Sequence, residues 1–166
     1  MRRTTVGVMG GSVADERTAA AARELGRLIA ENGWVLVSGG RPTGVMQASV
    51  YGAKEAGGLT VGVLYDEDRD CAAEGLDIVL PTGMGAGRNI INVLSSDVVV
   101  ACRGTGGTLS EIALALRFDR PVVLLDFDPG EAFLSAGAAG AKWSLAATPE
   151  QAISQVQGYL KELGRA

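Results

Sequence analysis

The chain has 166 residues, 47% of them hydrophobic and 20% charged, which predicts one soluble domain with a sizeable core. Its net charge is −4 without a cluster of lysine and arginine, which argues against nucleic acid as a partner but permits a small anionic ligand. It has no histidine, which removes the usual general base, the usual zinc ligand and every Ser-His or Cys-His catalytic unit.

The N-terminal apolar run is too short for a signal peptide, and no segment is apolar enough to span a membrane. We therefore expect a cytoplasmic protein that has no membrane partner. Cys71 and Cys102 are too few for a disulfide framework. Without histidine, and with these two cysteines far apart in the sequence, we expect no metal site.

Short β-rich runs alternate with Ala- and Leu-rich helical stretches along the whole chain. Runs such as VVVAC and PVVLLD are continuously apolar, as is typical of parallel strands buried on both faces. The expected strands are residues 4–9, 34–38, 60–64, 77–80, 97–102 and 121–126, with a weaker one at 143–146. The alternation predicts an α/β fold, a single Rossmann-like doubly wound domain over residues 1–166, with a mostly parallel sheet of about six to seven strands.

The helices between these strands are predicted from apolar spacing. Residues 15–31 place Ala22, Leu25 and Ile29 on one face of a helix. Residues 107–117 have apolar residues at i, i+3, i+4 and i+7, and the expected inward stripe is Leu109, Ile112, Ala113 and Leu116.

Two later helices are predicted from their capping residues. Residues 128–131 read Asp-Pro-Gly-Glu, and residues 148–151 read Thr-Pro-Glu-Gln. Each tetrapeptide supplies an N-cap residue, a proline at the first helical position, and a Glu or Gln two positions later. We therefore expect a helix to begin at each of them.

Glycine-rich loops follow four of the strands. They read MGGSVADE after the first strand, VSGGRPTGVMQA after the second, PTGMGAGRNIIN after the fourth and CRGTGGTLSE after the fifth. In a doubly wound sheet these loops lie at one edge, where helix N-termini and their unpaired N–H groups attract anions. Glycine lets the backbone approach a ligand closely. Hydroxyl donors and two arginines are available there: Ser12, Thr43, Thr105, Thr108, Arg41 and Arg88.

Each loop taken alone also has a purely structural interpretation. Neither the G-x-G-x-x-G dinucleotide fingerprint nor the G-x-x-x-x-G-K-[ST] loop is present. The segment from Thr108 to Glu111 fits a capping box, in which Glu111 would only bind the N-cap amide. Arg88 could be a surface residue, although the helix dipole disfavours a cation at a helix start. Taken together, the four loops favour ligand binding.

Three of these segments together resemble the Lonely Guy (LOG) and molybdenum-cofactor carrier superfamily. They are SGG with GVM in residues 38–46, GRN in residues 87–89, and GTGGTLSE in residues 104–111. The match runs from Val6 to the helix after Thr148. The resemblance implies a Rossmann-like fold and a nucleotide-like ligand that carries a phosphate.

LOG enzymes hydrolyse the N-glycosidic bond of cytokinin riboside monophosphates. The resemblance implies that Glu111 takes the place of their catalytic glutamate and Arg88 that of their catalytic arginine. A carboxylate and an oriented water suit an oxocarbenium-like transition state. Arg103 replaces a proline of the enzyme motif, Thr105 its second glycine and Asn89 a lysine. These departures make the chain more similar to the carrier branch, whose members bind a phosphate-bearing pterin cofactor.

We therefore expect a cytoplasmic carrier-type binding protein for the molybdenum cofactor or a nucleotide-like ligand, with no cofactor needed for catalysis. The alternatives are a LOG-type nucleoside 5′-monophosphate phosphoribohydrolase and a non-catalytic structural protein on the same scaffold. From the apolar helix at residues 109–118 and from the resemblance, we expect a homodimer or homotetramer. The candidate ligand-binding residues are Gly10, Gly11, Ser12, Gly39, Gly40, Gly44, Val45, Met46, Arg88, Asn89, Gly104, Thr105, Gly106, Gly107, Thr108 and Glu111.

Overall fold

A computed structural model describes residues 2–165, which build one sheet of seven parallel strands in the order β4-β3-β2-β1-β5-β6-β7. The predicted α/β fold is confirmed, and the sheet is wholly rather than mostly parallel. The weak strand near Trp143 is present as an edge strand. The strands are β1 (Thr5–Met9), β2 (Val35–Ser38), β3 (Thr60–Leu64), β4 (Ile78–Pro81), β5 (Val98–Ala101), β6 (Val122–Leu125) and β7 (Trp143–Ala146).

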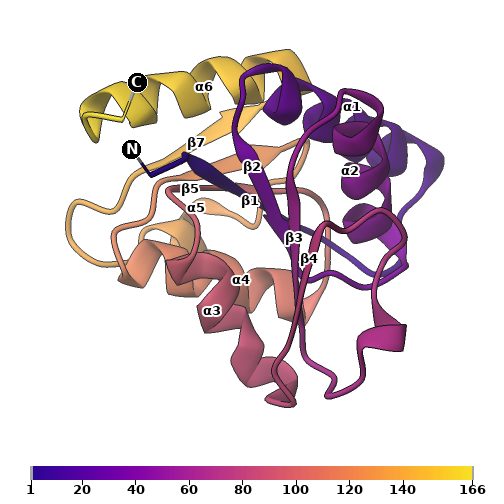
Figure 1. Cartoon of the computed structure of the whole chain (residues 1–166). Coiled ribbons are helices and arrows are strands. Elements are labelled where there is room, and N and C mark those ends of the chain that lie inside the picture. The colour runs from indigo at the N-terminus through magenta and orange to yellow at the C-terminus, as the bar shows by residue number, and fades with distance from the viewer. Residues whose placement is uncertain (1, 166) are drawn as a thin grey trace.

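The helices cover both faces of the sheet (Figure 1). One layer holds α1 (Glu16–Glu31), α2 (Gly44–Glu55) and α6 (Pro149–Glu162), and the other holds α3 (Arg88–Leu94), α4 (Gly106–Arg117) and α5 (Glu131–Leu134). Two short 3-10 turns flank β4, η1 (Arg69–Cys71) and η2 (Gly85–Gly87). In residues 2–165, no helix combines the length and hydropathy needed to cross a bilayer.

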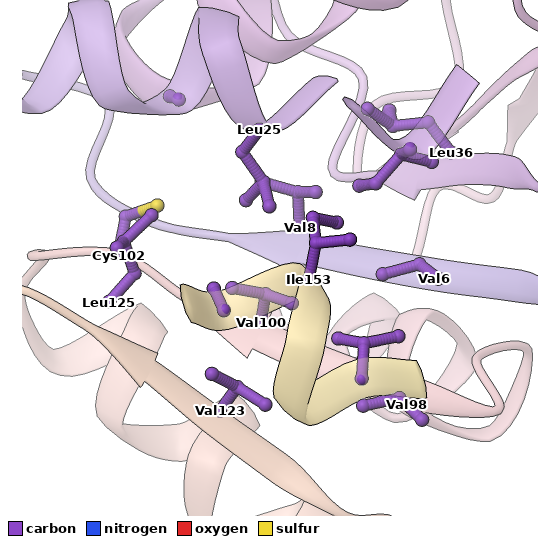
Figure 2. Packing of buried hydrophobic residues seen from close by; sticks show 14 of the residues in the cluster. Val6, Val8, Leu25, Leu36, Val98, Val100, Cys102, Val123, Leu125 and Ile153 are labelled. Atoms are coloured by element: carbon purple, nitrogen blue, oxygen red, sulfur yellow. The ribbon is translucent and has the colours of Figure 1, made fainter. Parts of the chain in front are cut away.

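The core consists of two apolar clusters, one on each face of the sheet. Val98 and Val100 of β5 contribute to the cluster under α1, α2 and α6, whereas Val99 and Ala101 contribute to the cluster under α3, α4 and α5. Figure 2 shows Leu25 of α1 and Ile153 of α6 among the valines of β1 and β5. Because successive strand residues point to opposite faces and both faces are covered, the central strands are continuously apolar.

Two of the predicted helix starts are confirmed, and one is wrong. Asp15 caps α1 through the Thr18 amide, and Thr148 caps α6 through the Gln151 amide with Pro149 at the first helical position. The segment at residues 128–131 instead forms a turn, in which the Asp128 carboxylate accepts from the amide of Gly130 at 2.8 Å. Gly130 itself is the N-cap, so α5 begins only at Glu131 and has four residues. The side-chain hydrogen bond of Asp128 stabilises a turn here rather than a helix start.

The inward face of α4 also differs from its predicted stripe. Ile112 and Leu116 are buried as expected, but Ala113 is exposed and Leu109 only partly buried. The buried positions in addition are Thr108, Glu111 and Ala115. Apolar spacing was misleading because α4 turns polar side chains inward at its first turns, where it borders the site described below.

Candidate functional site

The site lies where the order of the strands changes direction. β1 and β5 are neighbours in the sheet, but the chain leaves β1 toward β2 and leaves β5 toward β6. Open α/β sheets bind ligands in the crevice beyond the carboxyl ends of such strands. A cavity of about 500 Å³ lies there, within the range typical of small-molecule sites.

Residues from four loops, from β1 and from α2, α3 and α4 line this cavity, and most of the predicted site residues are among them. The lining residues are Val8, Met9, Gly10, Gly11, Ser12, Val13, Gly39, Arg41, Thr43, Met46, Tyr65, Arg88, Asn89, Thr105, Gly107, Thr108 and Glu111. The strand order brings the loops after β1, β2, β3 and β5 and the start of α3 to one place.

Five predicted residues do not line the cavity, namely Gly40, Gly44, Val45, Gly104 and Gly106. Gly40 and Gly104 belong to the loops, whereas Gly44, Val45 and Gly106 lie in the first turns of α2 and α4. Gly40 has a φ of 70°, and a Cβ there would meet the backbone of Gly62 on β3. A Cβ on Gly104 would meet the side chain of Thr108. The Val45 amide donates to the Gly11 carbonyl at 3.0 Å and so joins two of the loops.

The cavity also contains residues that the sequence did not single out as ligand contacts. Arg41 and Thr43 were predicted only as available donors, while Val8, Met9, Val13 and Tyr65 were not predicted. Tyr65 directly follows β3, at the same edge as the glycine-rich loops. Its position after a predicted strand was a usable signal, but its loop has no glycine cluster to draw attention.

The N-terminus of α4 opens into the cavity. α4 begins at Gly106, and Thr105 is an N-cap residue whose side chain makes no capping bond. The first amides of a helix have no partner within it, and together with the positive end of its dipole they favour an anion. Thr105, Gly107 and Thr108 line the cavity at this point. A phosphate group therefore has backbone and hydroxyl donors available in one place.

The capping-box interpretation of residues 108–111 is wrong. Thr108 is not the N-cap, and the Glu111 carboxylate accepts from Asn92 Nδ2 on α3 at 3.0 Å. Asn89, which occupies the lysine position of the enzyme motif, donates to Ser110 Oγ at 2.8 Å, and Ser110 Oγ donates to the Gly107 carbonyl at 2.6 Å. Side chains of α3 thus hold the first turns of α4 in place.

Arg88 is the first residue of α3 and is 8% exposed. Its Nη1 donates to the carbonyls of Gly39 at 2.6 Å and Val63 at 2.5 Å, at the carboxyl ends of β2 and β3. Burial lowers the pKa of Arg88, an effect that the charges of Glu111 and Asp66 oppose. The helix dipole disfavours a cation at the start of α3, but these two carbonyls accept hydrogen bonds from the Arg88 guanidinium and so stabilise it there.

Glu111 is the buried titratable carboxyl of the cavity, 7% exposed. Burial raises the pKa of Glu111 to about 7, although the Asn92 hydrogen bond and the Arg88 charge act in the opposite direction. The buried Oδ1 of Asn92 has no hydrogen-bond partner among residues 2–165. A carboxyl with this pKa exchanges its proton near neutral pH, so Glu111 can serve as an acid, a base or a hydrogen-bond donor.

We expect Glu111→Gln to stabilise the protein above neutral pH. The folded pKa of about 7 exceeds the unfolded value of 4.5, so the stabilisation from protonating Glu111 is complete below pH 4.5 and is lost as pH rises to about 7. The neutral amide avoids this loss. The variant's advantage in unfolding free energy should therefore grow with pH and level off at about 3 kcal/mol.

Urea unfolding of both proteins at about pH 5 and about pH 8 measures this difference. Glu67→Gln is the matched control, because Glu67 is an exposed acid on the loop after β3 that does not line the cavity. A Glu111→Gln effect of equal size at both pH values would contradict the raised pKa.

Comparison with known proteins shows which family and which solved structures the chain is similar to. The model of the SLOG cluster4 family matches residues 3–153. The structure of the molybdenum cofactor binding protein of Rippkaea orientalis is 44% identical and superimposes with a TM-score of 0.90, covering 96% of this chain and 99% of that chain. The molybdenum cofactor carrier protein of Chlamydomonas reinhardtii is 42% identical with a TM-score of 0.87, over 96% and 99% of the two chains.

A more distant relative is the cytokinin riboside 5′-monophosphate phosphoribohydrolase of Mycobacterium tuberculosis. It is 34% identical over 113 residues, which are 63% of this chain and 60% of that protein. The resemblance to LOG enzymes and to molybdenum-cofactor carriers is thus confirmed, with higher identity to the carriers. The chain belongs to the SLOG cluster4 family.

Proposed function

We propose that this protein binds a phosphate-bearing small molecule without cleaving it, as a carrier of the molybdenum cofactor. The observation that carries the proposal is the open N-terminus of α4 in a cavity of about 500 Å³, with Thr105, Gly107 and Thr108 at its wall. The similarity to two proteins described as binding or carrying that cofactor supports the choice of ligand.

The donor groups of the cavity fit the organic part of this cofactor. Its phosphate would accept hydrogen bonds from the first amides of α4, and its pterin would lie between the loops after β2 and β3. Neither Cys71 nor Cys102 lines the cavity, and burial raises the pKa of Cys102 to about 12. The carrier would therefore hold its cargo through phosphate and pterin, without a thiolate bond from the protein to molybdenum.

A hydrolase is the second candidate, and one observation favours it. Glu111 lies at the cavity wall with a pKa near 7, which suits general acid–base chemistry at neutral pH. The role of Arg88 is less suited to catalysis, because its Nη1 is occupied by the carbonyls of Gly39 and Val63. We therefore place the carrier first and the phosphoribohydrolase second.

Thermal unfolding with ligands tests the proposal. A molecule that binds only the folded state at about 100 times its Kd adds about 2.7 kcal/mol to stability, which for this chain length raises Tm by roughly 5–11 °C. The ligands are a pterin monophosphate, GMP, AMP and inorganic phosphate. A rise with the phosphorylated compounds supports binding. No rise with any of them would leave the third alternative, a structural protein that retains the scaffold.

Chromatography after incubation with candidate substrates separates a carrier from an enzyme. AMP and a cytokinin riboside monophosphate are incubated with the protein, and free base is measured. A carrier binds and releases no base. Base released by the wild type but not by Glu111→Gln would establish the phosphoribohydrolase instead, since a glutamine side chain cannot act as a general acid or base.

We also propose, from the sequence, a cytoplasmic location and a homodimer or homotetramer. A groove between α3 and α4 is lined in part by Ile90, Ala113 and Leu114, and Phe118 is exposed at the end of α4. Burying such apolar surface against a second copy would be favourable. Sedimentation velocity tests the assembly, and a single species of 17.0 kDa would contradict it.

A further inference from the structure

Arg41 and Tyr65 form a stacked pair at the opposite side of the cavity from α4. Arg41 comes from the loop after β2 and Tyr65 follows β3, and both line the cavity. The Arg41 Cζ lies 4.5 Å from the centroid of the Tyr65 ring, a distance typical of a cation–π contact. The Tyr65 ring also lies 5.6 Å from the Cζ of Arg88, so it carries two guanidinium groups.

The hydrogen-bond donors of Arg41 are uncommitted. Across residues 2–165 its guanidinium makes no hydrogen bond, and its one ion pair is a long one, from Nη1 to Asp66 Oδ2 at 3.9 Å. Among the described residues, that oxygen has no hydrogen-bond partner of its own. The side chain of Arg41 is 30% exposed, so a bound molecule can reach it. The tyrosine ring holds a planar fork of donors in position, which is the arrangement that binds two neighbouring acceptors at once.

The strand order sets the distance between the Arg41 guanidinium and the proposed phosphate position at the N-terminus of α4. β5, which leads to α4, is separated from β2 by β1 alone, and from β3 by β1 and β2. Neighbouring strands are about 4.8 Å apart, so the two ends of the cavity are separated by on the order of 10 Å. A nucleoside monophosphate, or a pterin with a phosphorylated side chain, extends over such a distance.

We propose that Arg41 selects the heterocycle of the ligand by its keto edge. The inference rests on the proposed function, since it requires the phosphate of the ligand to lie at α4. Guanine and an oxidised pterin both present a keto oxygen next to a ring nitrogen acceptor, and a guanidinium binds such a pair bidentately. A reduced pterin keeps the keto oxygen but has a hydrogen on that nitrogen, so it would accept one bond from Arg41 instead of two. Adenine presents an amino donor at the position of the keto oxygen, so the donors of Arg41 would face another donor. The site therefore takes oxo-heterocycles in preference to amino-heterocycles.

Binding measurements with GMP and AMP test the inference, because the two nucleotides have the same ribose and phosphate. The wild type should bind GMP, and a pterin monophosphate, about tenfold more tightly than AMP. Arg41→Met should remove most of this preference by weakening GMP about tenfold and AMP much less. Arg41→Lys retains the charge but not the fork, and should also lose the preference.

The supporting ring has its own pair of variants. Tyr65→Phe keeps the ring and should keep the preference, whereas Tyr65→Leu should reduce it. Arg69→Gln is the matched control, because it removes an exposed arginine from the loop between β3 and β4 that does not line the cavity. The Tm of each unliganded variant checks that it is folded.

Failure of the inference and failure of the proposed function give different results. Equal wild-type affinity for GMP and AMP, or equal weakening of both by Arg41→Met, would overturn the inference and leave phosphate binding intact. Equal weakening of GMP and AMP by Arg41→Met would show that Arg41 attracts anions in general. Failure of the wild type to bind the pterin monophosphate, GMP, AMP and inorganic phosphate alike would overturn the proposed function and the inference together.

Discussion

Gly107→Asp should weaken the binding of phosphate-bearing ligands by about 100-fold or more without destabilising the fold. Gly107 lines the cavity in the first turn of α4, and a Cβ added there meets nothing within 4 Å. A carboxylate at this position favours the helix, because it interacts with the positive end of the helix dipole. The same carboxylate lies where the phosphate would bind and repels it.

Isothermal titration with a pterin monophosphate measures the affinity, and thermal unfolding measures the stability. Gly107→Asn is the matched control, since it has nearly the same shape and no charge, and its loss of affinity should be much smaller. If Gly107→Asp bound the ligand within about threefold of the asparagine variant, the phosphate would not lie at the N-terminus of α4.

Gly52→Ala should lower the free energy of unfolding by about 3 kcal/mol. α1 and α2 pack so closely that a Cβ on Gly52 would overlap the backbone carbonyl of Arg23, and a Cβ on Gly26 would overlap that of Ser49. The clash is with backbone, so relief requires the two helices to separate. Their separation would loosen the core, because both helices pack on the same face of the sheet.

Thermal and urea unfolding check this effect, with an expected fall in Tm of roughly 6–12 °C. Gly158→Ala is the control within α6, because Gly158 is exposed and a Cβ there meets nothing within 4 Å. Helix propensity alone should make that variant more stable by about 0.5–1 kcal/mol. A gain in stability for Gly52→Ala as well would show that α1 and α2 adjust to the methyl group without strain.

The pattern of the sequence was sufficient to predict the architecture and the sheet edge at which the candidate site lies. Continuous apolar runs such as residues 97–102 predict strands covered on both faces, because each side chain of such a run is buried on one face or the other. Glycine clusters after these strands predict where the backbone opens toward a ligand. Both signals are local, so one sequence reveals them, and the strand order then places the loops at one edge.

The contacts between segments distant in the chain could only come from the tertiary structure. Arg88 binds carbonyls of Gly39 and Val63, and Glu111 is paired with Asn92 of another helix. Tyr65 was missed because its role depends on Arg41, which comes from the loop after the neighbouring strand β2. The order of the strands and the packing of the helices over them decide which polar groups meet, and therefore which carboxyl has a raised pKa. Apolar periodicity along the chain contains no information about either the strand order or the helix packing.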